Sequence, residues 1–168
     1  LKRRSSCLGR GEPLRHAKRK NVIMLDRLAT TLRIRGGARL EGSVATHGAK
    51  NAALPIMAAA FLAKGTVTLH RIPRITDVSV MWSLLEALGA RIRSQGDNSV
   101  TIDASNVASY RAPYALVRKL AASFDVVGPL LGRFGQAEVP LPGGCVLGTR
   151  ATDMHEQAFV ALGCDVHT

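Results

Sequence analysis

A run of twelve residues without a polar side chain constrains the fold of this chain more than any other feature. It extends over residues 52–63 and reads AALPIMAAAFLA. A helix of this composition is apolar on every face, so we expect it to be buried on all sides. Pro55 is compatible with a helix only in the first turn, which predicts a start between Asn51 and Leu54. The Lys-Gly pair that follows is a typical helix stop.

Strand and helix patterns alternate after this run. Thr66–His70 alternates as a strand with Val67 and Leu69 facing inward. Asp77 and Asp153 are the expected N-caps of two later helices. In chain order, the expected elements are a strand, turn and strand over 31–45, the apolar helix, strands at 66–70, 90–93 and 99–103 with a helix at 77–88 among them, a helical stretch from 113 broken at 128–129, a strand at 136–141, a helix at 153–162 and a last strand.

Two segments of the chain repeat the same order of elements. Thr76-Asp77 opens a helix that ends in Ala-Leu-Gly, and Thr152-Asp153 opens another that ends in the same way about 75 residues later. A period this long indicates duplicated βαβαββ-like units, each with two helices against a mixed sheet. The second unit stops at Thr168 before its hairpin is complete, so we expect a truncated α/β fold.

The net charge of +11 is concentrated at the start of the chain. Residues 1–30 hold nine Lys and Arg against two acids, and they include no Phe, Tyr or Trp. A nucleic-acid-binding surface needs an ordered basic face, so we expect a disordered or non-native leader with no nucleic-acid partner. A basic ribosome-associated protein remains the alternative, and deletion of residues 1–30 would test it.

Neither a secretory signal nor a membrane span is expected from the apolar runs of this sequence. Cys7, Cys145 and Cys164 are an odd number at unrelated spacings. This favours free thiols in a reducing compartment, so we expect a cytoplasmic protein without a membrane partner.

Residues 141–150, LPGGCVLGTR, place the thiol of Cys145 on a glycine-rich loop. The two glycines allow a tight turn and a close approach to a ligand. Arg150 offers a rigid fork for phosphate or carboxylate oxygens, and its positive charge favours the thiolate of the nearby Cys145. The alternative is a surface turn that holds an inert cysteine.

Lys50 and Asn51 stand where a glycine-bearing loop enters the apolar helix. Free backbone N–H groups and the helix dipole favour an anion at such a point, and a Lys adds a mobile positive charge. A solvated Lys ahead of the helix is the alternative. Because the helix is expected to be buried, we expect its N-terminal Lys50 to face a cleft or an interface.

Together these segments resemble the N-terminal part of the enolpyruvyl transferase family, in particular its members that act on UDP-N-acetylglucosamine. The resemblance extends from about residue 32 to residue 168, and the cysteine loop distinguishes it from the sister enzyme that acts on shikimate phosphate. It implies an inside-out α/β barrel with buried helices. The matching stretches are GAKNAALP at 48–55, GPLL at 128–131, RFGQ at 133–136 and PGGC at 142–145.

The resemblance implies transfer of the enolpyruvyl group of phosphoenolpyruvate to the 3′-hydroxyl of UDP-N-acetylglucosamine, without metal or cofactor. This is the first committed step of peptidoglycan precursor synthesis. Cys145 matches the proton donor and the position that fosfomycin alkylates. Lys50, Asn51 and Arg150 match positions that hold phosphoenolpyruvate. The positions matching contacts to the UDP-sugar are Asn51, Ala121, Arg150, Ala151, Thr152, Asp153 and Met154.

Two departures from the family pattern bear on activity. Ala121 stands where the family carries an Arg that contacts substrate, and we expect the second of the family's two similar domains to be missing from this chain. We therefore expect residues 31–168 to form part of a first domain, with the missing C-terminal domain as its partner. The chain alone is expected to be nearly inactive. A degenerate or truncated UDP-sugar-binding fragment without catalytic activity is the alternative.

Overall fold

The computed structural model describes residues 23–25, 32–34, 36–37, 39–142 and 151–167. Contacts divide the chain into two units, Leu1–Ala45 and Thr46–Thr168. In the first unit, strands β1 (Ile23–Leu25) and β2 (Leu32–Ile34) pair antiparallel. Strand β1 thus lies within the segment expected to be disordered. The second strand expected after the Gly36-Gly37 turn is not formed in residues 39–45.

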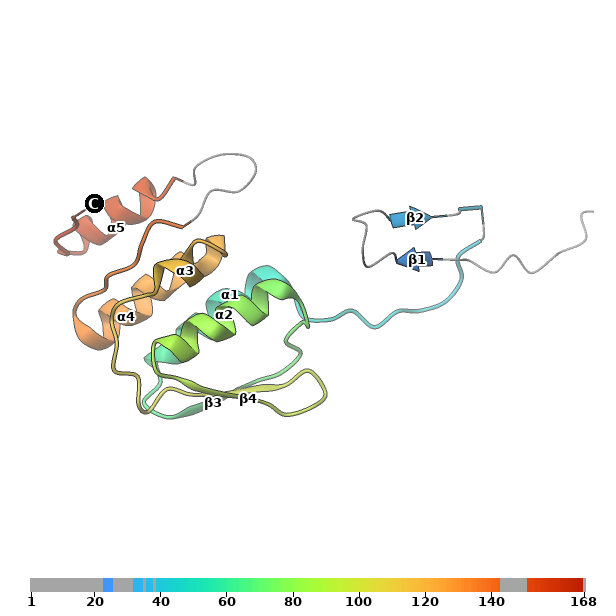
Figure 1. Ribbon diagram of the computed structural model, residues 1–168, viewed down its shortest axis with the longest axis horizontal. Helices are drawn as coiled ribbons and strands as arrows, with labels where there is room; N and C mark the ends of the chain where they lie inside the picture. Colours follow the sequence, from blue (N-terminus) through green and yellow to red (C-terminus); the bar gives the residue numbers. More distant parts are fainter. Residues whose placement is uncertain (1–22, 26–31, 35, 38, 143–150, 168) are drawn as a thin grey trace, which may run out of the picture. The chain divides into compact units, whose positions relative to one another are not determined.

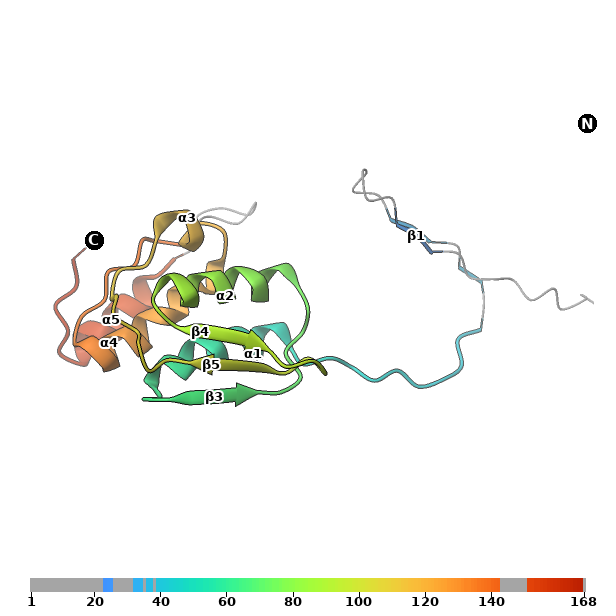
Figure 2. The same cartoon turned by 60° about the horizontal axis from the view of Figure 1, so that its bottom comes forward.

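A three-stranded sheet forms one layer of the second unit. Its strands β3 (Thr66–Leu69), β4 (Arg91–Ser94) and β5 (Val100–Asp103) lie in the order β3-β5-β4. Both outer strands pair antiparallel with β5, so β3 and β4 run parallel with a strand between them (Figure 2). The expectation of a mixed sheet is therefore wrong for this sheet, because β5 folds back from β4 and lies between β3 and β4, which makes both neighbouring pairs antiparallel.

Two helices pack side by side against this sheet (Figure 1). They are α1 (Lys50–Ala59), which continues into the short 3-10 helix η1 (Ala60–Leu62), and α2 (Thr76–Ala87). Helix α1 begins earlier than expected, so Pro55 lies in its second turn. Because Pro has no N–H, the fold forgoes one bond of the helix there.

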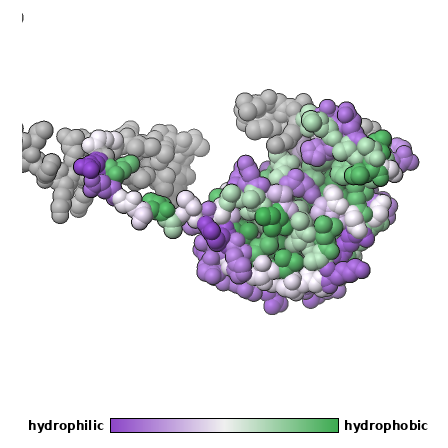
Figure 3. All heavy atoms as spheres, turned by 180° about the vertical axis from the view of Figure 1, so that it is seen from behind, coloured by the Kyte–Doolittle hydropathy of each residue, from purple (hydrophilic) through white to green (hydrophobic). Residues whose placement is uncertain are grey.

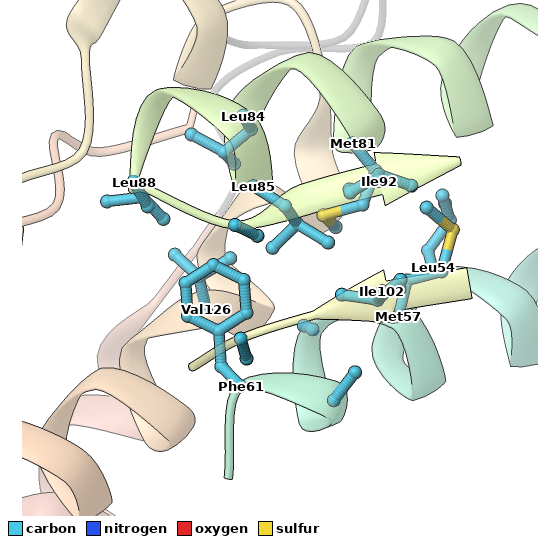
Figure 4. Close-up of a cluster of buried hydrophobic side chains, with 14 of the residues drawn as sticks. Leu54, Met57, Phe61, Met81, Leu84, Leu85, Leu88, Ile92, Ile102 and Val126 are labelled. Atoms are coloured by element: carbon cyan, nitrogen blue, oxygen red, sulfur yellow. The ribbon is translucent and has the colours of Figure 1, made fainter. Parts of the chain in front are cut away.

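The core lies where α1, α2 and the sheet meet. Figure 4 shows side chains from both helices and from β4 and β5 pointing toward one another. This core is aliphatic apart from Phe61, as expected from the low aromatic content. Its largest fully buried side chains are Phe61, Leu54, Met57, Met81, Leu84, Leu85, Leu88, Ile102, Leu130, Val117 and Val126.

Only one face of the apolar helix is buried, which corrects the expectation that it is covered on all sides. Ala53, Leu54 and Met57 are buried, whereas Ile56 is 49% exposed and Leu62 in η1 is 58% exposed. The buried face packs against α2 and a second 3-10 helix, η2 (Ala121–Val126). The opposite face of α1, which carries Ile56, stays exposed among the described residues. Figure 3 shows hydrophobic residues at the surface on the face seen from behind.

The expected long helix after residue 113 is divided differently in the structure. It consists of α3 (Tyr114–Val117), η2 and α4 (Val127–Phe134), and the chain leaves the helical path at 118–120. It does not break at Gly128-Pro129, because Pro129 occupies the first turn of α4, where a missing N–H costs no helical bond.

The last part of the described chain contains one helix, α5 (Asp153–Ala161). The strand expected at 136–141 is reduced to a single parallel bridge between Arg111 and Glu138, in a segment that contains Pro140 and is followed by Pro142. The last strand expected after α5 is not formed in residues 164–167. Cys164, which follows α5, is a free thiol and is partly exposed.

Candidate functional site

The loop that leads into α1 is held against a turn that follows β3. A Cβ atom added at Gly48 would lie 1.9 Å from the carbonyl oxygen of Arg71, so only glycine permits this contact. Arg71 itself adopts a left-handed backbone with φ of 60°, and its guanidinium donates to the carbonyl of Thr46 at 3.4 Å. The sequence showed a glycine in this loop without indicating the close contact, and nothing in it pointed to Arg71, because arginine rarely adopts positive φ.

Lys50 is the first residue of α1, and its ammonium pairs with the carboxylate of Asp77 on α2. The Lys50 side chain is 52% exposed and that of Asp77 is 33% exposed, so the pair lies at the edge of the packed helices. The expectation that Asp77 caps α2 is wrong. The N-cap is Ile75, without a side-chain cap bond, and the Asp77 carboxylate reaches the neighbouring helix instead.

The start of α1 is suited to an anion. The N–H groups of Ala52 and Ala53 both donate to the carbonyl of Ala49, at 3.2 and 2.9 Å. By helix geometry, the N–H groups of Lys50 and Asn51 precede the first of these bonds and point out of the helix end. The first turn contains no acidic residue, so the positive end of the dipole and the ammonium act in the same direction.

A second group of predicted site residues lies at the start of α5. Thr152 is buried and is the N-cap, and its hydroxyl donates to Glu156 at 2.6 Å. Asp153, expected as the cap, is instead the first helical residue. Met154 is 77% exposed and Ala151 is exposed, so both are accessible to a ligand.

Helix η2 connects these two groups. It begins at Ala121, which is half-buried, and it packs against α1. Its Phe124 ring meets the ring of His155 on α5 edge-on at 5.6 Å between centroids. Among the described residues, no hydrogen bond or ion pair joins Lys50 to the start of α5.

The remaining predicted site residues, Cys145 and Arg150, lie outside the described residues. Cys7, the third cysteine, lies outside them as well. Within the described ranges, no three His, Cys, Asp or Glu side chains are grouped as a metal site would require. No helix in those ranges combines the length and apolar character needed to cross a bilayer.

Comparisons with known proteins place the chain in a family. The model of the family EPSP synthase (3-phosphoshikimate 1-carboxyvinyltransferase) matches residues 34–168. A UDP-N-acetylglucosamine 1-carboxyvinyltransferase of Dichelobacter nodosus is 50% identical over 135 residues, which are 80% of this chain and 32% of that protein. The protein of the same name from Chlorobium limicola is 51% identical over 134 residues, or 79% of this chain and 31% of its own length.

A solved structure supports the same assignment. The enolpyruvyl transferase NikO from Streptomyces tendae is 33% identical, with a TM-score of 0.55 over 61% of this chain and 24% of NikO. The chain therefore has an α/β enolpyruvyl transferase fold, and it spans about a third of the length of the curated relatives it matches. The resemblance drawn from the sequence is confirmed: this chain belongs to the EPSP synthase (3-phosphoshikimate 1-carboxyvinyltransferase) family.

Proposed function

We propose that this chain carries part of the active site of an enolpyruvyl transferase that uses phosphoenolpyruvate and UDP-N-acetylglucosamine. The sugar 3′-oxygen would bond to C2 of the enolpyruvyl group, the bond from C2 to the phosphate oxygen would break, and inorganic phosphate would leave with the hydroxyl proton. The proposal rests on sequence identity: about half of the aligned residues are identical to relatives that are named for this activity. The family match over residues 34–168 includes every proposed site residue.

The proposed roles follow from the chemistry of the two substrates. Phosphoenolpyruvate is a small polyanion, and Lys50, Asn51 and Arg150 supply cations and N–H donors for it. Cys145 protonates the methylene carbon when the sugar oxygen adds to C2, and that proton is lost again on elimination. The start of α5, from Ala151 to Met154, contacts the UDP-sugar.

The described geometry supports the part of this proposal that concerns phosphoenolpyruvate. The α1 terminus presents the half-exposed ammonium of Lys50, paired with Asp77, beside the first N–H groups of the helix. We further propose that the rest of the site comes from sequence beyond the matched third of the family protein, closing an inside-out barrel over the helices. The chain alone would then release phosphate far more slowly than a relative of full length.

Labelling with fosfomycin tests the proposed role of the Cys145 sulfur. We expect the 168-residue chain, incubated with fosfomycin and UDP-N-acetylglucosamine, to form a covalent adduct that peptide mass spectrometry locates at Cys145. Cys7 and Cys164 are internal controls with the same intrinsic chemistry, and Cys145→Ser is the matched variant. Equal labelling of all three thiols, or labelling that persists in Cys145→Ser, would contradict the proposed role of Cys145.

Ala121 favours a second candidate, a UDP-sugar-binding fragment without catalytic activity. The resemblance implies an arginine here, and loss of such a charged contact costs about 1.5–3 kcal/mol, or roughly ten- to a hundredfold in affinity. We expect Ala121→Arg to strengthen UDP-N-acetylglucosamine binding by about tenfold or more in calorimetry. If binding is strong without this change and no fosfomycin adduct forms, the binding-only function is correct.

A further inference from the structure

We propose that Asp77 is a positioning residue for Lys50. Its carboxylate holds the Lys50 ammonium where α1 and α2 begin, so that an anionic ligand meets a cation that is already in place. Asp77 touches no ligand in this proposal and acts only through Lys50. The inference rests on the proposed function, since it requires Lys50 to bind the anion.

The carboxylate is a fixed point because the two helices are fixed to each other. Lys50 is the first residue of α1 and Asp77 the second residue of α2, and these helices pack together along their length. Met57 and Met81, on the facing sides of the two helices, are both fully buried. A short Asp side chain on a rigid helix therefore restrains the long, flexible Lys side chain, which has much rotamer freedom to lose.

The contacts of Asp77 separate this role from two simpler ones. A capping role is excluded because α2 has no side-chain cap bond. A purely stabilising role is weak because the partners are 52% and 33% exposed, and ion pairs at such exposure contribute little to stability. The ammonium has three donors, so the bond to Asp77 leaves two for a ligand.

Removing the carboxylate has two effects of opposite sign on anion binding. The site becomes more positive, which strengthens anion binding. The Lys50 side chain also gains rotamer freedom that it must lose again when the anion binds, which weakens binding. The Asp77 carboxylate is 33% exposed, so solvent and salt partly screen the effect of its negative charge on the anion. The loss of side-chain order is not screened, so weaker binding is the expected result.

Titration of the 168-residue chain with phosphoenolpyruvate, followed by amide NMR shifts, tests this sign. We expect Asp77→Asn to weaken binding about three- to tenfold and to narrow the spread of the Lys50 Cε proton signals. Glu86→Gln removes one negative charge from the exposed far end of α2 and is the matched control, with unchanged affinity. Unchanged or tighter binding in Asp77→Asn would overturn the proposal.

Two further variants keep the test decisive. Asp77→Glu keeps the charge but moves the carboxylate by one methylene, so it should weaken binding about two- to threefold and leave thermal unfolding unchanged. A role in charge alone predicts unchanged affinity for this variant. Lys50→Ala separates the two proposals: if it does not alter phosphoenolpyruvate binding, the proposed function fails at Lys50, whereas a strong loss with a neutral Asp77→Asn removes only the role of Asp77.

Discussion

Helices α2 and α5 share a sequence signature but differ completely in burial. Each begins at a Thr-Asp pair and is followed by Leu-Gly, about 75 residues apart. Helix α2 buries four side chains, those of Val78, Met81, Leu84 and Leu85, whereas α5 buries none. The pattern therefore determines that a helix forms, and the neighbours in space determine whether it joins the core.

The surroundings of the two helices explain the difference. Helix α2 packs against α1, α3, η2 and β4. Helix α5 instead borders a cavity of about 220 Å³, which α4 and the segment before residue 142 line on the other side. On α5 and just after it, Met154, Val160 and Leu162 are 77%, 57% and 80% exposed. The first half of the unit holds most of the core, and the second half ends in a helix whose apolar side chains are largely exposed.

The largest effect is expected from truncating a buried leucine of α2. Leu85 is fully buried, so Leu85→Ala should lower the free energy of unfolding by about 2–5 kcal/mol. The same change at Leu162, next to α5, should cost less than about 0.5 kcal/mol because that side chain is 80% exposed. Urea unfolding measures both, and equal losses would show that the two helices do not differ in solution.

Arg133 joins the two halves, and its removal should have the next largest effect. Its guanidinium donates to four backbone carbonyls, those of Phe61, Ala63, Ala104 and Ser105, at 2.6 to 3.4 Å. We expect Arg133→Ala to cost about 1.5–3 kcal/mol, since three of these acceptors, on Phe61, Ala63 and Ala104, are buried or half-buried and lose a charged donor.

The controls for Arg133 are a lysine at the same site and an exposed arginine. Arg133→Lys cannot serve four acceptors with a single ammonium, so it should recover only part of the loss. Arg118 lies over the ring of Tyr114 at 5.8 Å in an exposed place, and Arg118→Ala should be nearly neutral. A neutral Arg133→Ala in urea unfolding would mean that α4 is held by apolar packing alone.

Much of the closed first half could be predicted from local patterns. Strands β3, β4 and β5 and helix α2 lie within one or two residues of their expected ranges. Their boundaries depend on local signals: Gly89, with φ of 109°, ends α2, and Asp97 and Asn98 make the hairpin turn with positive φ. Such signals act over a few residues and need no knowledge of the rest of the fold.

The predictions that were wrong concern features that depend on partners distant in the sequence. The open face of α1 could not be predicted, because an apolar composition does not show whether a neighbouring element covers the helix. The segment 136–141 has strand composition but pairs only through one bridge. At the candidate site, Lys50 lies at a helix start as expected, whereas its pairing with Asp77 follows from the packing of two helices and has no local signature.

Acid sensitivity offers a smaller test of the first half. Asp103 ends β5, and hydrogen bonds from the Ser105 hydroxyl and N–H, with smaller contributions from Arg91 and Arg93, lower the pKa of its carboxyl. A lowered folded-state pKa contributes stability above the unfolded-state pKa of about 3.9, and this is lost as the pH falls through the folded value. Between pH 6 and 2, the free energy of unfolding should fall less steeply with pH in Asp103→Asn than in the wild-type chain. If the two pH profiles are the same, the Asp103 carboxyl does not contribute to the acid sensitivity of the fold.

The smallest effect is expected on the open face of α5. Serine and valine have similar helix propensities, so Val160→Ser changes little except surface polarity. Because Val160 is 57% exposed, Val160→Ser should change the free energy of unfolding of the chain by less than about 0.5 kcal/mol. The same substitution at the buried Val78 of α2 should lower that free energy several times more. If Val160→Ser costs more than about 1 kcal/mol, then α5 is covered in solution, and sedimentation of the wild-type chain would show whether a second copy covers it. An unchanged stability and a monomeric chain would together mean that α5 folds as a helix without help from its apolar face.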